Sequence, residues 1–289
     1  MSAPGRPERE FAPERDGAEG RPRSIDWAGV AHETVRGRPR IACLVPSLTE
    51  TLFALGAGDD VVARTGFCIH PRERVRSVPK VGGTKDPDLR KLAALAPTHL
   101  VVNVDENRRE DVEAARAFVE HVIVTHPMAP EDNIRLVKLL GAIFGRDADA
   151  ARLAASIEGA FRDLSVHAST LPRERVLYVI WRKPWMTVSR DTYISRTLAL
   201  VGWDTLPADT HARYPELALD AAMLADAAHV LLSSEPYRFR ERDIGVVQKL
   251  LPKKARCSVR LIDGEMTSWY GSRAIHGLRG LARLRASLA

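Results

Sequence analysis

Long hydrophobic runs are absent from this chain of 289 residues. No segment holds the roughly eighteen consecutive apolar residues that a membrane-spanning helix needs. Residues 1–40 are rich in Arg, Glu, Pro and Gly and lack the apolar run of a secretion signal. We therefore expect no membrane insertion and a cytoplasmic location. Residues 1–40 should be disordered or loosely attached, because such a composition buries too little apolar surface to offset chain entropy.

Cysteine is scarce, and its arrangement excludes two kinds of scaffold. The three cysteines, Cys43, Cys68 and Cys257, are an odd number and contain no CxxC pair. This argues against a disulfide scaffold and a structural zinc site. In Cys68-Ile69-His70 a thiol and an imidazole lie two residues apart, a spacing that could chelate a metal or activate a thiolate. Because no further ligands follow at a usual spacing, Cys68 and His70 are only weak metal candidates.

The motifs of common enzyme classes are missing as well. The sequence contains no Gly-rich phosphate loop with Lys-Ser/Thr, no GxSxG elbow, no HExxH and no GxGxxG. We therefore assign no catalytic residue and no intrinsic cofactor, and we do not expect an enzyme. The net charge of +6 comes from arginines interleaved with acids along the chain. That pattern is typical of a solvated surface and not of a nucleic-acid site.

One long helical pattern divides the chain. Apolar residues recur at three- and four-residue steps from Asp147 to Thr170, which is typical of a helix half buried against a core. At about 1.5 Å per residue it would reach roughly 30–35 Å, enough to bridge two domains. We expect a first α/β lobe at 41–146, the linking helix at 147–171 and a second α/β lobe at 172–289.

Strand-like runs alternate with helical patterns on both sides of this helix, which predicts parallel sheets in two Rossmann-like lobes. The expected strands are 40–45, 61–65, 99–104 and 122–125 in the first half, and 176–181, 229–232 and 259–262 in the second. The letters LRKLAALAPTHLVVNVDEN in the first half parallel LDAAMLADAAHVLLSSEPY in the second. An internal duplication would explain this similarity.

Polar and aromatic residues follow the predicted strands, where α/β sheets bind ligands. Two lobes whose loops face each other predict a cleft. Flat aromatic side chains at its mouth would offer stacking faces, and polar loop side chains would offer specific contacts. The expected ligand-binding residues are Ser47, Phe67, His70, Lys85, Glu106, Asn107, Trp181, Trp185, Glu235, Tyr237, Trp269 and Tyr270.

Several short motifs resemble a known family in order and spacing. They are VPSLTE followed by LFALG at 45–56, CIHP at 68–71, PKVGGT at 79–84, LAALAPTHLVV at 92–102 and WYGSR at 269–273. The chain resembles the helical-backbone, class III solute-binding proteins, which serve cobalamin and ferric-siderophore import. The resemblance covers roughly 41–285. It implies two α/β lobes bridged by a rigid helix, a ligand held in a shallow cleft between them, and little hinge closure.

The resulting functional hypothesis is a cytoplasmic binding protein for a corrinoid, a haem or another metal-bearing macrocycle or iron chelate. Arg90 stands where import members carry an acid for the permease, and Val81 stands where cobalamin receptors carry tryptophan. Because of Arg90 and the lack of a secretion signal, we do not expect docking on an ABC permease. One alternative is a cytoplasmic metal- or cofactor-modifying enzyme that uses Cys68 and His70. The other is the substrate-binding component of a cobalamin or iron-chelate ABC importer whose start was misread.

Overall fold

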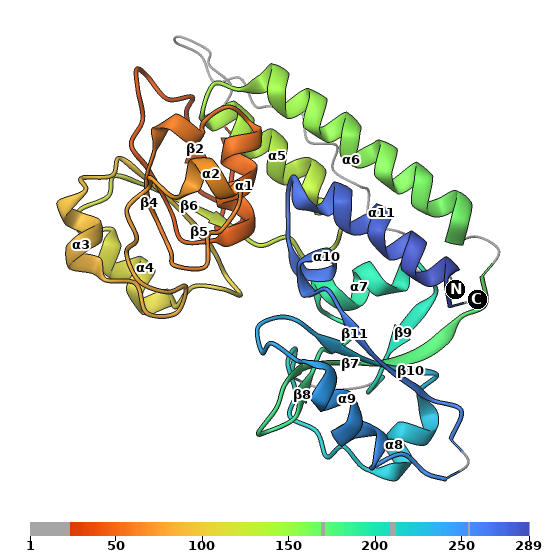
Figure 1. Cartoon of the computed structure of the whole chain (residues 1–289). Helices are drawn as coiled ribbons and strands as arrows, with labels where there is room; N and C mark the ends of the chain where they lie inside the picture. The colour runs from red at the N-terminus through yellow and green to blue at the C-terminus, as the bar shows by residue number, and fades with distance from the viewer. Residues whose placement is uncertain (1–23, 169–170, 209–211, 254, 289) are drawn as a thin grey trace, which may run out of the picture.

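The N-terminal lobe is built on one parallel sheet. A computed structural model describes residues 24–168, 171–208, 212–253 and 255–288, and Figure 1 shows them as two lobes joined by a long helix. The sheet of the first lobe has the order β4-β3-β5-β6. Its strands are β3 (Ile41–Cys43), β4 (Val61–Arg64), β5 (His99–Asn103) and β6 (His121–Thr125). The helical elements are α1 (Pro46–Ala54), η1 (Gly58–Asp60), α2 (Arg72–Val75), α3 (Leu89–Ala94), α4 (Arg109–Ala115) and α5 (Asp132–Ile143).

Helices cover both faces of this sheet, which explains why its central strand β5 is buried along its whole length. Leu52 of α1 and Leu140 of α5 pack with Ile123 on one face. Leu92 of α3 and Val112 of α4 belong to the core of the other face. Both cores also take in residues of the long loop region after β4, such as Cys68 and Val81, which fixes this region on the lobe.

The C-terminal lobe repeats this arrangement. Its parallel strands have the order β9-β7-β10-β11, which is the order second, first, third, fourth along the chain, as in the first lobe. The strands are β7 (Glu174–Trp181), β8 (Met186–Thr187), β9 (Trp203–Thr205), β10 (His229–Ser233) and β11 (Ser258–Ile262), with β8 antiparallel to β7. The helices are α7 (Tyr193–Ala199), α8 (Ala221–Asp226), α9 (Glu241–Gln248), α10 (Gly264–Ser268) and α11 (Arg273–Ala286). The common strand order is what an internal duplication predicts.

A single helix, α6 (Asp147–Ala168), joins the lobes and packs against both. Its 22 residues correspond to about 33 Å. Ala150 near its start belongs to the core of the first lobe, and Ala160 and Leu164 belong to the core of the second. Its neighbours are α5 of the first lobe and α11 of the second, as Figure 1 shows. The two lobes therefore share one continuous backbone helix.

Residues 24–40 correct one expectation, because they pack on the first lobe. They form a short antiparallel hairpin of β1 (Ser24–Ile25) and β2 (Ala31–His32). The Asp26 carboxylate, which is 2% exposed, accepts a 2.9 Å bond from the Val124 amide at the edge of β6. Arg135 places its guanidinium 4.1 Å from the Trp27 ring. A buried ionised group with these partners holds the segment against the lobe; residues 1–23 lie outside the described part.

Other differences concern short elements. The strands β8 and β9 and the helices α2 and α10 were not predicted, because two to five residues carry no readable periodicity. The insertion of α10 means that Trp269 follows a helical turn and not the end of β11 directly. Within the described residues, no helix has the length and apolar character to cross a membrane.

Candidate functional site

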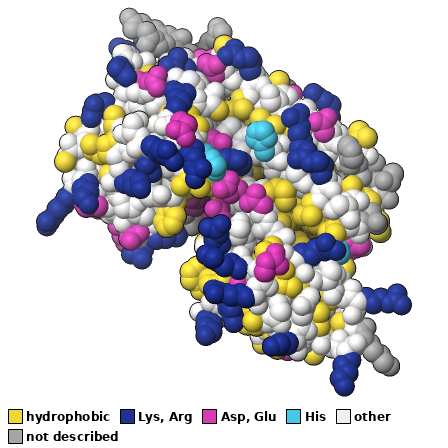
Figure 2. Space-filling model, viewed as in Figure 1, with side chains coloured by type: hydrophobic (Ala, Val, Ile, Leu, Met, Phe, Trp, Pro, Cys, Tyr) yellow, Lys and Arg dark blue, Asp and Glu magenta, His cyan; other side chains and the backbone are white. Residues whose placement is uncertain are grey.

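The loops at the carboxyl ends of the two sheets face each other where the lobes meet. His70, after β4 of the first lobe, places its Nε2 3.2 Å from the carboxylate of Glu265 in the second lobe. The His70 ring also meets the edge of Trp269, with ring centroids 5.5 Å apart. Figure 2 shows acidic side chains and a histidine gathered at this junction, with Lys and Arg side chains on both lobes around it. The junction therefore has a polar centre, by which we mean His70 and Glu265 together with the neighbouring acids Glu106 and Glu235.

Two carboxyl groups in this centre lie in environments that favour protonation. Burial, together with the charge of Glu235, raises the pKa of Glu106 to about 8, although nearby Lys85 acts in the opposite direction. Burial also raises the pKa of Glu235, whose carboxylate accepts a 2.7 Å bond from the Trp269 indole. At neutral pH Glu106 is therefore largely protonated and can donate a hydrogen bond. Within the described part of the chain, neither carboxyl forms an ion pair.

An arginine from the second lobe reaches into the first lobe beside these acids. The Arg213 guanidinium pairs with Asp105 and lies 3.1 Å from the His126 ring nitrogen. Tyr214 donates a 3.3 Å bond from its hydroxyl to the same carboxylate. The side chains of Arg213 and Asp105 are 26% and 11% exposed, so the pair is partly shielded from solvent. It joins the lobes at one side of the polar centre.

A packed contact between the lobes lies beyond the polar centre. The Asn133 amide group donates a 2.8 Å bond to the Tyr193 hydroxyl, and Tyr193 meets the edge of Tyr270 at 4.8 Å. Gly271, with φ of +66°, comes so close to Thr51 of α1 that an added Cβ would lie 2.1 Å from the Thr51 hydroxyl oxygen. Glycine is thus required where the second lobe touches α1. This close packing fixes the relative position of the lobes.

The predicted aromatic residues fall into two groups. Trp181 is 38% exposed and meets the edge of Tyr237, so both can present surface to a ligand. Trp185 is half-buried and stacks on Phe239. Trp269 and Tyr270 are only 7% and 5% exposed. This placement differs from the stacking surface we expected for both, because the Trp269 indole is buried against Glu235 and the Tyr270 ring belongs to the core of the first lobe.

The predicted polar residues also differ in exposure, because Asn107 and Ser47 are buried and Lys85 is exposed. The Asn107 side chain is buried and donates to the backbone carbonyls of Leu44 and Thr84, so it ties loops together. Ser47 is 2% exposed, and its hydroxyl has no hydrogen-bond partner among the described residues. Lys85 is exposed and donates a 2.7 Å bond to the Asp105 carbonyl. Of these three, only Lys85 has an exposed side chain.

The Cys68 thiol, a weak metal candidate from the sequence, is buried inside its loop. It lies 3.2 Å from the hydroxyls of Thr49 and Thr65, and burial raises its pKa. A thiol in such surroundings is a poor nucleophile and a poor metal ligand. Among the residues that the structure describes, no group of three or more His, Cys, Asp or Glu side chains could hold a metal ion.

Exposed apolar side chains occur at or just after the carboxyl ends of the strands and were only partly predicted. Phe67 and Ile69 after β4 are 62% and 48% exposed, and Val104 after β5 is 51% exposed. Trp181 is the last residue of β7 in the second lobe and is 38% exposed. Ile69, Val104, Arg213, Tyr214 and Glu265 were missing from the predicted set. Position directly after a buried strand could have identified Val104, whereas nothing in the local sequence marks Arg213 or Tyr214.

Comparison with known proteins agrees with this architecture. The chain is 22% identical over 181 residues to a vitamin B12-binding protein of Vibrio parahaemolyticus, covering 63% of this chain and 66% of that one. It is 26% identical over 197 residues to the uncharacterised ABC transporter substrate-binding lipoprotein YvrC of Bacillus subtilis, covering 65% of this chain and 62% of that one. The alignments thus span slightly less than two thirds of either relative.

Solved structures share the fold at low sequence identity. The periplasmic vitamin B12-binding protein BtuF of Vibrio cholerae superposes with a TM-score of 0.71 at 15% identity, covering 86% of this chain and 97% of that one. The periplasmic heme-binding protein RhuT of Roseiflexus sp. RS-1 gives 0.73 at 20%, covering 87% and 99%. The sequence profile of the periplasmic binding proteins matches residues 41–245. With two lobes, a bridging helix and a profile match over most of its length, the chain belongs to the periplasmic binding protein family.

Proposed function

We propose that this protein binds a corrinoid between its two lobes and performs no catalysis. The observation that carries the proposal is that Phe67, Ile69 and Val104 of the first lobe and Trp181 of the second, all at or just after the carboxyl ends of strands, leave apolar surface exposed. A corrinoid has apolar ring faces and a rim of neutral amides. The names of the relatives above support a ligand of this class.

The charge of the polar centre favours a corrinoid over a haem. Asp105 and Glu265 are matched by Arg213 and by His70, but Glu106 and Glu235 have no basic ion-pair partner in the described residues. A protonated Glu106 can donate to an amide carbonyl. The two propionate charges of a haem would instead enter a centre in which Arg213 is already paired with Asp105 and His70 with Glu265, so these cations are not free to compensate the charges in a partly desolvated site.

Calorimetric titration with cyanocobalamin, dicyanocobinamide and hemin tests the proposal. We expect Phe67→Ala and Trp181→Ala each to weaken corrinoid binding by about tenfold, since loss of one aromatic contact typically costs about 1–3 kcal/mol. Val166→Ala is the matched control, because Val166 is 72% exposed on α6, away from the loops. Tighter binding of hemin than of both corrinoids would contradict the ligand class. Unchanged affinity in both cleft variants would contradict the site.

The lack of a permease partner is a further part of the proposal. Arg90 is exposed on α3, and its neighbour Lys91 pairs with Asp88 at 3.1 Å. A permease that presents arginines would meet like charge here. Binding of the full chain to a cobalamin permease in detergent, strengthened at low salt, would contradict this part. The cytoplasmic location also stays a prediction, which fractionation of the native host tests.

A further inference from the structure

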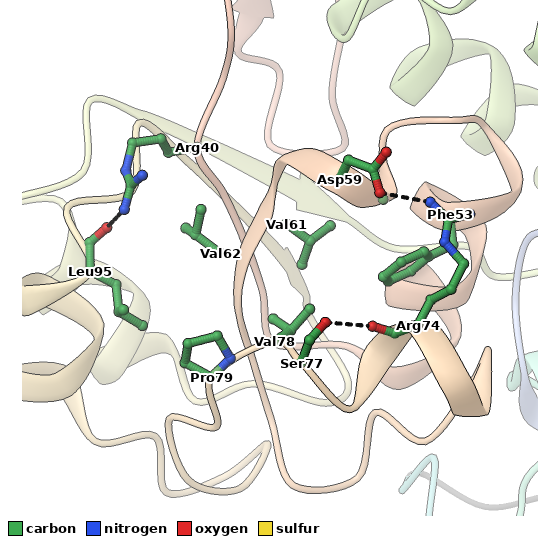
Figure 3. Close-up of a pocket in the computed structure, with 11 residues that line it drawn as sticks. Arg40, Phe53, Asp59, Val61, Val62, Arg74, Ser77, Val78, Pro79 and Leu95 are labelled. Carbon is green, nitrogen blue, oxygen red and sulfur yellow. Dashed lines mark hydrogen bonds and ion pairs between the residues drawn. The ribbon is translucent and has the colours of Figure 1, made fainter.

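A pocket of about 500 Å³ lies on the first lobe, at the edge of its sheet (Figure 3). Its lining includes Arg40, which directly precedes β3, and Asp59, which lies in η1 just before β4. The pocket therefore opens near the amino ends of the strands, whereas the proposed corrinoid cleft lies at their carboxyl ends. The volume of the pocket lies within the range of about 300–1,000 Å³ that is typical of small-molecule sites.

The floor of the pocket is aliphatic and interrupts the edge of the sheet. Val61 and Val78 are 6% and 7% exposed there. Ile41 pairs with Val61 and Ala42 pairs with Ala63, so Val62 is an extra residue without a counterpart in β3. On the outer side of β4, Lys80 forms a β-bridge with Arg64, and among the described residues no such bridge is formed at Val62. Bulges of this kind are common beside functional sites.

One end of the pocket is polar but compensated in charge. Figure 3 shows Arg74 and Asp59 together at one end and Arg40 at the opposite end. Arg74 donates a 2.8 Å bond to the Asp59 carboxylate, and its guanidinium lies 4.9 Å from the Phe53 ring centroid. A ligand meets little net charge on that side.

The other end carries a cation without a carboxylate partner. Arg40 donates from Nε to the Ala96 carbonyl at 3.0 Å and from Nη2 to the Leu95 carbonyl at 2.5 Å. These bonds orient the guanidinium. In the described part of the chain, Arg40 makes no ion pair, and no bond uses its Nη1 group. Two N–H donors therefore remain for an anionic ligand.

We propose that this pocket is a second binding site, which takes a small monocarboxylate with an aliphatic body. The carboxylate accepts from Nη1 of Arg40, and the aliphatic part lies on Val61, Val62 and Val78. The proposal goes beyond corrinoid binding and does not depend on it. A carboxylate suits the Arg40 end because charge-assisted hydrogen bonds to guanidinium are among the strong ones.

Titration of the full chain with octanoate, followed in methyl NMR spectra, tests the proposal. We expect saturable shifts of the Val61, Val62, Val78 and Leu95 methyl signals. Arg40→Gln should weaken octanoate binding about tenfold, because it removes the charge-assisted bond. Val62→Asp should weaken it similarly by repulsion while leaving Arg40 in place. Arg90→Gln is the matched control for loss of an exposed arginine and should change nothing.

Thermal unfolding of each variant separates loss of binding from loss of structure. Val62→Asp covers the case in which Arg40→Gln disturbs the end of α3. Equal binding of octanoate and 1-octanol would show that no carboxylate is recognised and would overturn the proposal. Shifts at Val104 in place of the pocket methyl groups, or no saturable shifts at millimolar octanoate, would also overturn it.

Discussion

Glu106 is the residue whose environment departs furthest from that of a surface acid. It follows β5 at the lobe junction, and its pKa of about 8 reflects burial first and the carboxyl of Glu235 second. An acid whose pKa is higher in the folded state than in the unfolded chain binds its proton on folding. The contribution of Glu106 to stability is then fully present below about pH 4.5 and is lost as the pH rises from there to about 8.

Glu106→Gln should therefore stabilise the protein at alkaline pH. We expect a gain of about 2 kcal/mol at pH 9, less than the full shift implies because the side chain keeps some solvent contact, and almost no gain at pH 4.5. Urea unfolding at the two pH values measures this difference. Glu158→Gln, on the exposed face of α6, should show no such pH dependence. A gain of equal size at both pH values would contradict the assigned pKa.

Positions after strands predicted which polar side chains meet between the lobes, whereas their role in ligand binding stays a prediction. His70, Glu106 and Glu235 lie at the lobe junction, as the pattern of strands followed by polar loops indicated. Tyr270 does not present a face, because the insertion of α10 and the close approach at Gly271 turn its ring into the core. Packing of this kind depends on contacts between lobes, which local sequence does not encode.

At the scale of elements, the contact between α5 and α6 depends on a missing side chain. A Cβ on Gly141 of α5 would lie 2.3 Å from the Cβ of Ala150 in α6. Gly159, on the same helix α6, faces open space apart from the tip of Arg162 at 3.8 Å. A side chain therefore has room at Gly159 but not at Gly141, although both residues are helical.

Alanine substitution at these two positions should have opposite effects. Gly141→Ala should lower the free energy of unfolding by about 1–3 kcal/mol, because overpacking outweighs the better helix propensity. Gly159→Ala should raise it by about 0.5–1 kcal/mol, because only the propensity changes. Denaturant unfolding of both variants measures this. Stabilisation by Gly141→Ala would show that α5 and α6 are not in close contact.

Long periodic elements were predictable, and short ones were not. The pattern from Asp147 onward predicted α6 because apolar residues recur through six turns. The hairpin of β1 and β2 escaped prediction because two-residue strands are fixed by a tertiary contact, the Asp26 carboxylate on the edge of β6. Composition alone predicted a loosely attached segment there, but the buried Asp26 carboxylate bonds to the first lobe and holds the segment on it.

For the whole molecule, the side-chain contacts between the lobes decide how far they can move. Asp105 and Arg213 are part of this connection, which reinforces α6. We expect a double-mutant cycle with Asp105→Asn and Arg213→Ala to give a coupling free energy of about 1–2 kcal/mol in unfolding experiments, because the pair is partly buried. A coupling near zero would show that solvent screens the pair and that it does not hold the lobes together.

The central claim is that one ligand contacts both lobes at the carboxyl ends of their strands. Hydrogen–deuterium exchange of the full chain, with and without saturating cyanocobalamin, tests it most directly. We predict slower exchange in 66–70 and 104–107 of the first lobe and, at the same corrinoid concentration, in 181–185 and 234–238 of the second. Exchange in α6 should stay the same, since a helix packed on both lobes does not bend on binding. Protection confined to one lobe, or absent from all four segments, would contradict the account.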